Sequence, residues 1–215
     1  QKNKFFKKHF LKSIFSYISP KSTPLYYLKI LFFLILIFLS SQKTFSKTGQ
    51  SIDSWVWVAS APAAAASGVE VTATNDAVYV FRGGSATFWK YIPTEDRWVW
   101  LSSAPAATGT GSDLVWTSGD FIYATRGNFT NEFWEYHISG DSWTIKASLP
   151  VNVSSGCSLA WTGGNYIYAT QGDGTGFYMY DITQDVWYST TSIPNPIGNG
   201  SELAWAGGNF IYMER

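Results

Sequence analysis

The sequence predicts an all-β fold in which a four-stranded antiparallel unit repeats along residues 51–215. Landmark residues recur every 43 to 45 positions, as in the series Trp55, Trp98, Trp143 and Trp187. A fixed period in this range indicates a repeat architecture. Short apolar runs alternate with turns rich in Gly, Asn, Asp and Pro. Aromatic residues make up 18% of the chain and charged residues only 14%, a composition that suits a large β structure.

Residues 1–50 differ from the repeats in charge and are expected to direct the chain to a membrane. They contain nine Lys and no acidic residue, whereas all fifteen Asp and Glu lie in residues 51–215. The apolar stretch at residues 25–41 predicts a hydrophobic helix, and its uninterrupted core, residues 30–39, has the length of a signal peptide. Two interpretations stay open: a cleaved secretory signal, or a retained anchor with its Lys-rich flank in the cytoplasm. Both predict that the repeats are secreted or lie on the cell surface.

The repeated region divides into three complete units with a partial unit at each end. The complete units span residues 63–105, 106–150 and 151–194. In the second unit we expect strands at about residues 113–116, 121–125, 132–136 and 142–146. These runs are often apolar at consecutive positions, which is typical of a strand covered on both faces. We therefore expect each sheet to pack between two neighbouring sheets.

Turn residues and tryptophans recur at matching places in every unit. Gly, Asn and Asp between the first two strands tolerate positive φ and suit tight hairpins. An Asp stands two residues before each landmark Trp, and we expect it to accept hydrogen bonds from backbone amides at the turn. Of the landmark series, Trp98, Trp143 and Trp187 are expected in the core. The same holds for the first-strand series Trp116, Trp161 and Trp205, for which stacking on sugar rings is the alternative.

These units resemble kelch repeats, the modules of kelch and galactose-oxidase-type β-propellers. The match is clearest where the apolar run Val78–Gly84 (VYVFRGG) is followed by Tyr91 and Trp98. The later copies keep only the first glycine of the pair, in Arg126-Gly127-Asn128 and Gln171-Gly172-Asp173. The resemblance implies a kelch-like β-propeller segment of four-stranded antiparallel blades. We expect it to belong to a longer protein, because propellers usually close with about 4 to 8 blades.

One series of polar residues is the best candidate for a ligand site. Each member stands three residues after a recurring Tyr, at the end of a second strand: Arg82, Arg126, Gln171 and Arg215. If strands alternate in direction, the loops after the second and fourth strands share one rim, which also carries Asn128, Asn131, Glu132, Asp173 and Thr175. Guanidinium groups there would bind a carboxylate or sugar hydroxyls. The alternative is that each Arg joins neighbouring blades through backbone carbonyls or stacks on a Trp.

The sequence offers little for catalysis. It contains only two histidines, His9 and His137, and one cysteine, Cys157, which we expect to be a small buried side chain. A copper or zinc site needs more ligands of these types, so we expect no catalytic residue, metal or cofactor. The acidic repeats lack the clustered Lys and Arg that nucleic-acid binding needs. Three glycosylation sequons begin at Asn128, Asn152 and Asn199 and are consistent with export.

We therefore expect a non-catalytic binding or scaffold module for an extracellular protein or glycan. Only its N-terminal segment would contact a membrane. Two alternatives stay open. The chain would be the propeller portion of a carbohydrate-active or galactose-oxidase-like enzyme whose catalytic residues lie outside it, or it would be a structural protein of the cell envelope.

Overall fold

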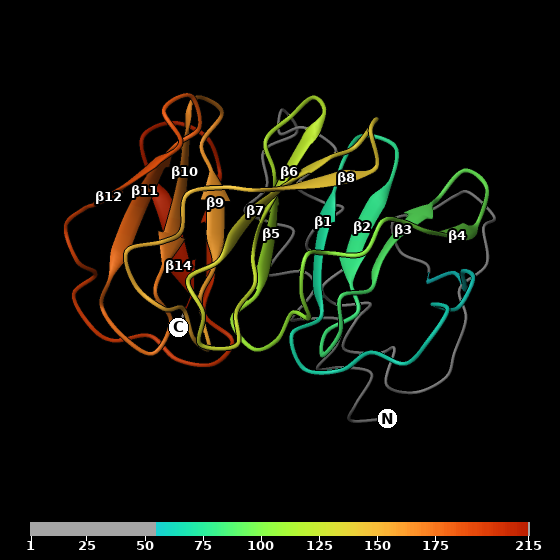
Figure 1. Ribbon diagram of the computed structural model, residues 1–215, viewed down its shortest axis with the longest axis horizontal. Helices are drawn as coiled ribbons and strands as arrows, with labels where there is room; N and C mark the ends of the chain where they lie inside the picture. Colours follow the sequence, from blue (N-terminus) through green and yellow to red (C-terminus); the bar gives the residue numbers. More distant parts are fainter. Residues whose placement is uncertain (1–54, 215) are drawn as a thin grey trace, which may run out of the picture. The chain divides into compact units, whose positions relative to one another are not determined.

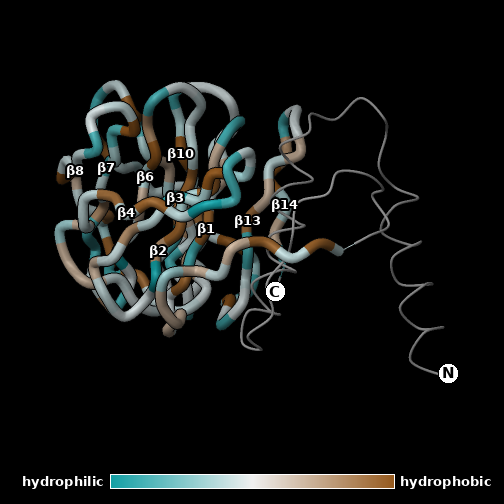
Figure 2. The backbone as a smooth tube through the Cα atoms, turned by 90° about the vertical axis from the view of Figure 1, so that its right-hand side faces the viewer, coloured by the Kyte–Doolittle hydropathy of each residue, from teal (hydrophilic) through white to brown (hydrophobic). Residues whose placement is uncertain are grey.

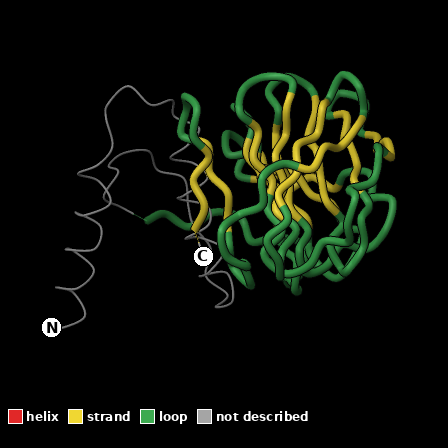
Figure 3. The backbone as a smooth tube through the Cα atoms, turned by 90° about the vertical axis from the view of Figure 1, so that its left-hand side faces the viewer, coloured by secondary structure: helices red, strands yellow, loops and turns green. Residues whose placement is uncertain are grey.

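The computed structural model describes residues 55–214, which contain fourteen β-strands joined by loops and turns (Figure 3). No helix in this part of the chain is long and apolar enough to cross a membrane. The predicted hydrophobic helix at residues 25–41 lies outside the described residues, and so does Arg215.

The strands form three four-stranded antiparallel sheets and one two-stranded sheet, each built from consecutive strands (Figure 1). Blade 1 contains β1 (Glu70–Ala73), β2 (Val78–Phe81), β3 (Phe88–Ile92) and β4 (Arg97–Trp100). Blade 2 contains β5 (Asp113–Trp116), β6 (Phe121–Thr125), β7 (Phe133–His137) and β8 (Ser142–Ile145). Blade 3 contains β9 (Leu159–Trp161), β10 (Tyr166–Thr170), β11 (Phe177–Asp181) and β12 (Val186–Ser189). A half-blade of β13 (Glu202–Trp205) and β14 (Ile211–Glu214) follows.

The strand positions predicted from the sequence are confirmed in blade 2. β5 and β6 have the predicted bounds, while β7 begins and ends one residue later and β8 ends one residue earlier than expected. The consecutive apolar runs are also explained. All four residues of β2 are buried, as are the last four of β6, because both faces of these strands are covered.

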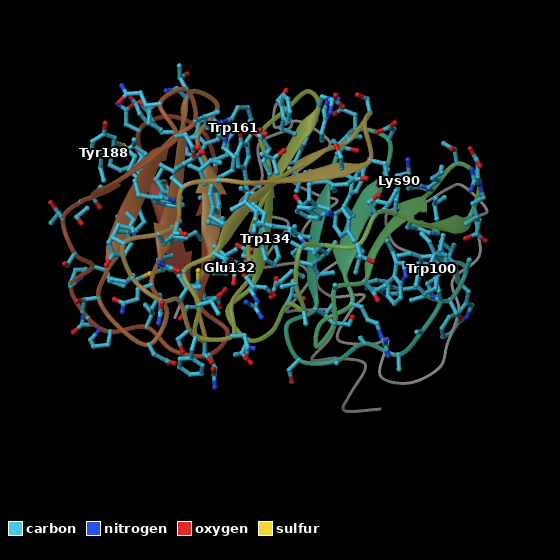
Figure 4. All side chains as sticks on the ribbon, viewed as in Figure 1. Lys90, Trp100, Glu132, Trp134, Trp161 and Tyr188 are labelled. Carbon is cyan, nitrogen blue, oxygen red and sulfur yellow. The ribbon has the colours of Figure 1, made fainter. Side chains whose placement is uncertain are left out.

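The blades are arranged side by side through their first strands. β5 lies between β1 and β9, and β9 in turn contacts β13. The fourth strands lie at the outside, where Figure 4 shows Trp100 of β4 and Tyr188 of β12 at opposite margins of the view. A propeller-like fold has this radial order, in which the first strands lie together at the centre and the fourth strands lie at the outside.

Aromatic side chains fill the spaces between consecutive blades. Phe88 of blade 1 contacts Tyr136 and Trp143 of blade 2, with ring centroids 4.9 and 5.0 Å apart. One blade further on, Phe133 contacts Tyr180 and Trp187 at 4.8 and 4.9 Å. All four of these contacts are edge-to-face, an arrangement that aromatic quadrupoles favour. Figure 2 shows hydrophobic residues along many of the strands.

A polar clamp joins each blade to the blade before it. In blade 2, Asp141 Oδ1 accepts hydrogen bonds from the backbone N–H of Ser102 at 2.8 Å and from the Tyr136 hydroxyl at 2.6 Å. The indole N–H of Trp143 donates to the carbonyl of the same Ser102 at 3.0 Å. Both backbone groups of one residue in the preceding blade are therefore paired by side chains of the next blade.

The clamp repeats in all three blades. Blade 1 holds Ala59 through Asp96 and Trp98, and blade 3 holds Ala147 through Asp185 and Trp187. The prediction that the recurring Asp accepts hydrogen bonds from backbone amides is confirmed, but the amide belongs to the neighbouring blade. The sequence could not indicate this partner, because it lies 37 to 39 residues earlier in the chain.

The other core predictions hold in part. Cys157 is buried as expected, and its burial raises the pKa of the thiol. Trp187 is buried, whereas Trp98 and Trp143 are half-buried, and Trp143 packs against the core between blades 1 and 2. A half-buried position fits the clamp, because the indole N–H must reach a backbone carbonyl near the surface.

Replacing Trp143 with Ala should destabilise the fold by about 3–5 kcal/mol, the usual loss for a large packed aromatic side chain. The substitution removes the ring contacts with Phe81 and Phe88 together with the hydrogen bond to Ser102. Urea denaturation would measure the loss. Ile145→Ala is the control, because Ile145 is 71% exposed and should change the unfolding free energy by less than about 0.5 kcal/mol. Equal losses in the two variants would contradict the blade packing described here.

The clamp also predicts a pH dependence of stability. Burial alone would raise the pKa of Asp141, but hydrogen bonds from Tyr136 and Ser102 outweigh it and lower the pKa below its ordinary value of 3.8. A carboxylate with a lowered folded-state pKa stabilises the fold above its unfolded pKa and loses this contribution as the pH falls through its folded pKa. We expect the urea concentration at the midpoint of unfolding to decrease when the pH is lowered below about 4.

Asp141→Asn isolates this contribution, since the amide keeps the shape of the side chain without its charge. The difference in unfolding free energy between the wild-type chain and this variant should shrink between pH 7 and pH 2. A difference that stays constant over this range would mean that the carboxylate charge does not stabilise the clamp.

Candidate functional site

The loops after the second and fourth strands share one rim, as predicted. We call this surface the loop rim and define it by residues 63–69, 82–87, 105–112, 126–132, 149–157 and 171–176. Backbone hydrogen bonds join its segments on both sides of blade 2. The N–H of Asn128 donates to Thr110 at 2.8 Å, and the N–H of Val153 donates to Thr130 at 2.9 Å.

A glycine after each second strand makes this close approach possible. Gly83, Gly127 and Gly172 all have left-handed φ values, of 76°, 70° and 71°. A Cβ atom on Gly127 would lie 2.3 Å from the backbone nitrogen of Ser112. The first glycine of the kelch-like pair is therefore required for two reasons: its backbone is left-handed, and it lies against the backbone of the loop that enters the same blade.

The second glycine of the pair is not required for the loop conformation. Gly84 has a φ of 60°, and the residues that replace it, Asn128 and Asp173, have φ values of 56° and 45°. Asn and Asp enter the left-handed region more readily than other residues with a side chain. The departures from Gly-Gly in the sequence thus preserve the left-handed backbone at this position.

Two of the predicted arginines hold the rim together. Arg82 Nε donates to the carbonyl of Ala64 at 2.9 Å, and Arg126 Nε donates to the carbonyl of Ala107 at 3.1 Å. Arg126 also forms an ion pair with Glu132, which lies near the middle of the view in Figure 4. These are the backbone contacts anticipated as the structural role of the series. Arg82 differs from Arg126 because its terminal amino groups have no hydrogen-bond or ion-pair partner among residues 55–214.

Other predicted rim residues also bond to the rim itself. Asn131 donates from Nδ2 to the carbonyl of Leu149 at 3.1 Å, and Asp173 accepts from the Ser154 hydroxyl at 2.6 Å. Gln171 and Thr175 accept backbone hydrogen bonds from Ser154 and Ile193. The structure therefore brings the predicted residues to one surface, and most of their polar groups stabilise the loops that form it.

Phe129 is a prominent rim residue that the sequence reasoning missed. Arg126 and Phe133 stand seven positions apart, whereas the corresponding residues of blades 1 and 3 are six apart, so blade 2 has one extra loop residue. Matching backbone hydrogen bonds identify the extra residue as Phe129, because Thr130 and Ser85 occupy equivalent positions. Its side chain is 68% exposed. The unequal spacing was the signal that could have revealed it.

The backbone at Phe129 is unfavourable for a bulky residue. Thr130 N donates to the carbonyl of Gly127 at 3.1 Å, which closes a tight turn with Asn128 and Phe129 at its centre. Both central residues have positive φ, 56° and 58°, as in a type I′ turn. Glycine is the residue favoured at the second central position of such turns. Phe129 therefore costs folding free energy and gains little packing in return.

The first-strand tryptophans lie at the opposite end of the blades. Trp116, Trp161 and Trp205 are half-buried, and each indole N–H donates to a carbonyl in the adjacent hairpin turn, at 3.0, 2.7 and 3.0 Å. Trp116 and Trp161 also pack against the cores between blades. These contacts give the series a structural role at the hairpin turns, and Figure 4 shows Trp161 at this end.

Residues 55–214 contain no group of three or more His, Cys, Asp or Glu side chains placed to hold a metal ion. The histidine in this part of the chain, His137, lies beside Asp120, with 2.6 Å between Nε2 and Oδ2. Hydrogen bonds from Ser139 are the main cause of the lowered pKa of Asp120, which lies at a hairpin turn away from the loop rim.

Comparison with known proteins supports the fold. No family model matches the sequence, and no curated protein matches it. Among solved structures, that of YjhT is similar, with a TM-score of 0.58 and 17% identity over 72% of this chain. The match covers 60% of the YjhT chain, so the present chain spans less than two thirds of its length. The similarity supports a β-propeller-like arrangement of antiparallel sheets.

The turn at Phe129 leads to a stability prediction. Phe129→Gly should raise the free energy of unfolding by about 1 kcal/mol, because glycine adopts the left-handed conformation without the steric cost borne by Phe. Gly127→Ala should lower it by more than about 1 kcal/mol, because its methyl group would collide with the backbone of Ser112. Urea denaturation of both variants measures these changes. Destabilisation by Phe129→Gly would show that the Phe side chain supports the fold.

Proposed function

We propose that this chain is part of an exported, kelch-like β-propeller protein that binds a partner protein at its loop rim and catalyses no reaction. The proposal rests on three features taken together. They are the repeated Gly, Tyr and Trp positions of the blades, the loop rim, and the exposed side chain of Phe129.

Phe129 is the observation that carries the proposal. A side chain that is inserted in one blade, exposed to solvent and placed in a costly backbone conformation is not explained by folding. Backbone strain of this kind tends to occur at sites of function. Aromatic residues and Arg are enriched in protein interfaces, and a few such residues supply most of the binding free energy. Arg82, with its free terminal amino groups, adds a charged contact on the same rim.

A protein partner fits this surface better than a glycan does. Phe129 lies at the centre of a tight turn and is 68% exposed, so it projects from the rim and does not line a hollow. A projecting aromatic side chain can enter a pocket on a partner protein, whereas small-molecule sites are concave. Asn131, Glu132 and Asp173 already bond to the rim, which leaves fewer polar groups for sugar hydroxyls.

Export remains part of the proposal and has two sources of support in the chain. The apolar stretch at residues 25–41 has the character of a signal or an anchor. The three sequon asparagines, Asn128, Asn152 and Asn199, are all exposed, as attachment of a glycan requires.

A pull-down with detergent extracts of cell surfaces, read by mass spectrometry, tests the proposal. Phe129→Gly is the test variant, because the same substitution should not weaken the fold. Phe210→Ala is the matched control, since Phe210 is 70% exposed but lies between β13 and β14, outside the loop rim. We expect proteins captured by the wild-type chain and by Phe210→Ala to be lost with Phe129→Gly.

Two results would remove the proposal. Identical protein sets from all three chains would show that Phe129 is not an anchor. Glycan-array binding that depends on Phe129, without any captured protein, would reassign the rim to a carbohydrate ligand.

A further inference from the structure

A cavity of about 530 Å³ lies between blades 1 and 2, at the hairpin-turn end of the blades. The turn after β1 borders it with Asn75 and Asp76, while β2 and β3 contribute Tyr79 and Lys90. Trp116 at the end of β5 borders it from blade 2. Its volume falls in the range of small-molecule sites, about 300–1,000 Å³. Lys90 and Trp161 are both labelled in the upper part of Figure 4, away from Glu132 of the loop rim.

A difference between the repeats leaves a polar group unpaired in this cavity. Tyr79 lies opposite Lys90 in the strand pair β2–β3, just as Tyr123 lies opposite Glu135 in β6–β7. The Tyr123 hydroxyl donates to the Glu135 carboxylate at 2.5 Å. Lys90 replaces that acceptor in blade 1, and the Tyr79 hydroxyl has no hydrogen-bond partner among the described residues.

The environment of Tyr79 makes this missing partner significant. The residue is only 2% exposed, and its ring packs against Phe88 and Tyr136. Burial is the main cause that raises its pKa to about 12, with nearby carboxylates, Asp76 first among them, adding to the shift. The hydroxyl therefore stays protonated at neutral pH and remains a donor. The hydroxyl borders the cavity, where a bound ligand can accept its hydrogen bond.

The charges around the cavity favour a neutral ligand. The Lys90 ammonium forms no ion pair with any residue in 55–214, and the Asp76 carboxylate accepts a hydrogen bond from the Thr74 hydroxyl at 2.8 Å. One positive and one negative group border the same space, so an ion of either sign would meet a like charge. A ligand with several hydroxyl groups can accept from Lys90 and donate to Asp76 at once.

Trp116 supplies the apolar element of the cavity. Its indole is half-buried and held by the hydrogen bond to Gly119, so its position is set before any ligand arrives. Aromatic surface with a few fixed donors and acceptors is the usual composition of a small-molecule site. We propose that this cavity binds a neutral sugar, with Tyr79, Lys90 and Asp76 contacting its hydroxyl groups and Trp116 its apolar C–H surface.

Saturation-transfer NMR with D-glucose, D-mannose and D-galactose tests the proposal on the full 215-residue chain. Tyr79→Phe removes one hydroxyl, and we expect it to weaken sugar binding by about tenfold, the ratio for loss of a buried hydrogen bond. The melting temperature should not fall, because this hydroxyl has no partner in the folded chain. Tyr123→Phe is the matched control: it loses a hydrogen bond to Glu135, so its melting temperature should fall while sugar binding is unchanged.

Three outcomes would overturn the proposal. The first is no saturation transfer to any of the three sugars. The second is binding by Tyr79→Phe equal to that of the wild-type chain. The third is transfer to acetate or glycine in preference to the sugars, which would mark an ion site. Phe129→Gly should bind sugar as the wild-type chain does. Failure of the loop-rim proposal and failure of the cavity proposal therefore give different results.

Discussion

The structure depends on one repeated interaction, in which side chains of each blade bind both backbone groups of one residue in the blade before. Asp141 and Trp143 do this to Ser102, and the same geometry recurs at Ala59 and Ala147. Aromatic packing tolerates a range of ring positions, whereas paired hydrogen bonds to one peptide fix how far each blade is displaced and rotated. The Tyr hydroxyl on each Asp joins the clamp to the aromatic core.

This constraint explains where the repeats can differ. The clamp and the packed aromatics form the contacts between neighbouring blades, so substitutions there would disturb two blades at once. The loop after β6 instead accepts an extra residue, because Gly127 and Asn128 keep the backbone approach to the preceding connection. The position opposite the recurring Tyr also varies, as Lys90, Glu135 and Met179. Blade 1 and blade 2 thus carry different surface features on nearly the same scaffold.

Much of the scaffold was predictable from the sequence. Period, turn residues and consecutive apolar runs located the strands of blade 2 to within one residue. Alternating strand direction placed Arg82, Arg126, Gln171 and Asp173 on one rim. Their individual roles were not predictable, because a guanidinium group that bonds to a carbonyl 18 or 19 residues away leaves no trace in local sequence. The unequal loop length did mark Phe129, but only the hydrogen-bond pattern shows which residue is extra.

The sequence by itself determined the all-β class, the number of described blades and the positions that must be glycine or aromatic. These features follow from short-range rules: strand period, turn conformation and the burial of apolar surface. Only the tertiary structure decided which peptide each Asp holds, which arginine keeps free donors and which Tyr lacks a partner. Such features depend on groups that are separated in the chain, by 39 residues for Asp141 and Ser102 of the clamp, and residue identity alone does not specify which polar atoms pair there.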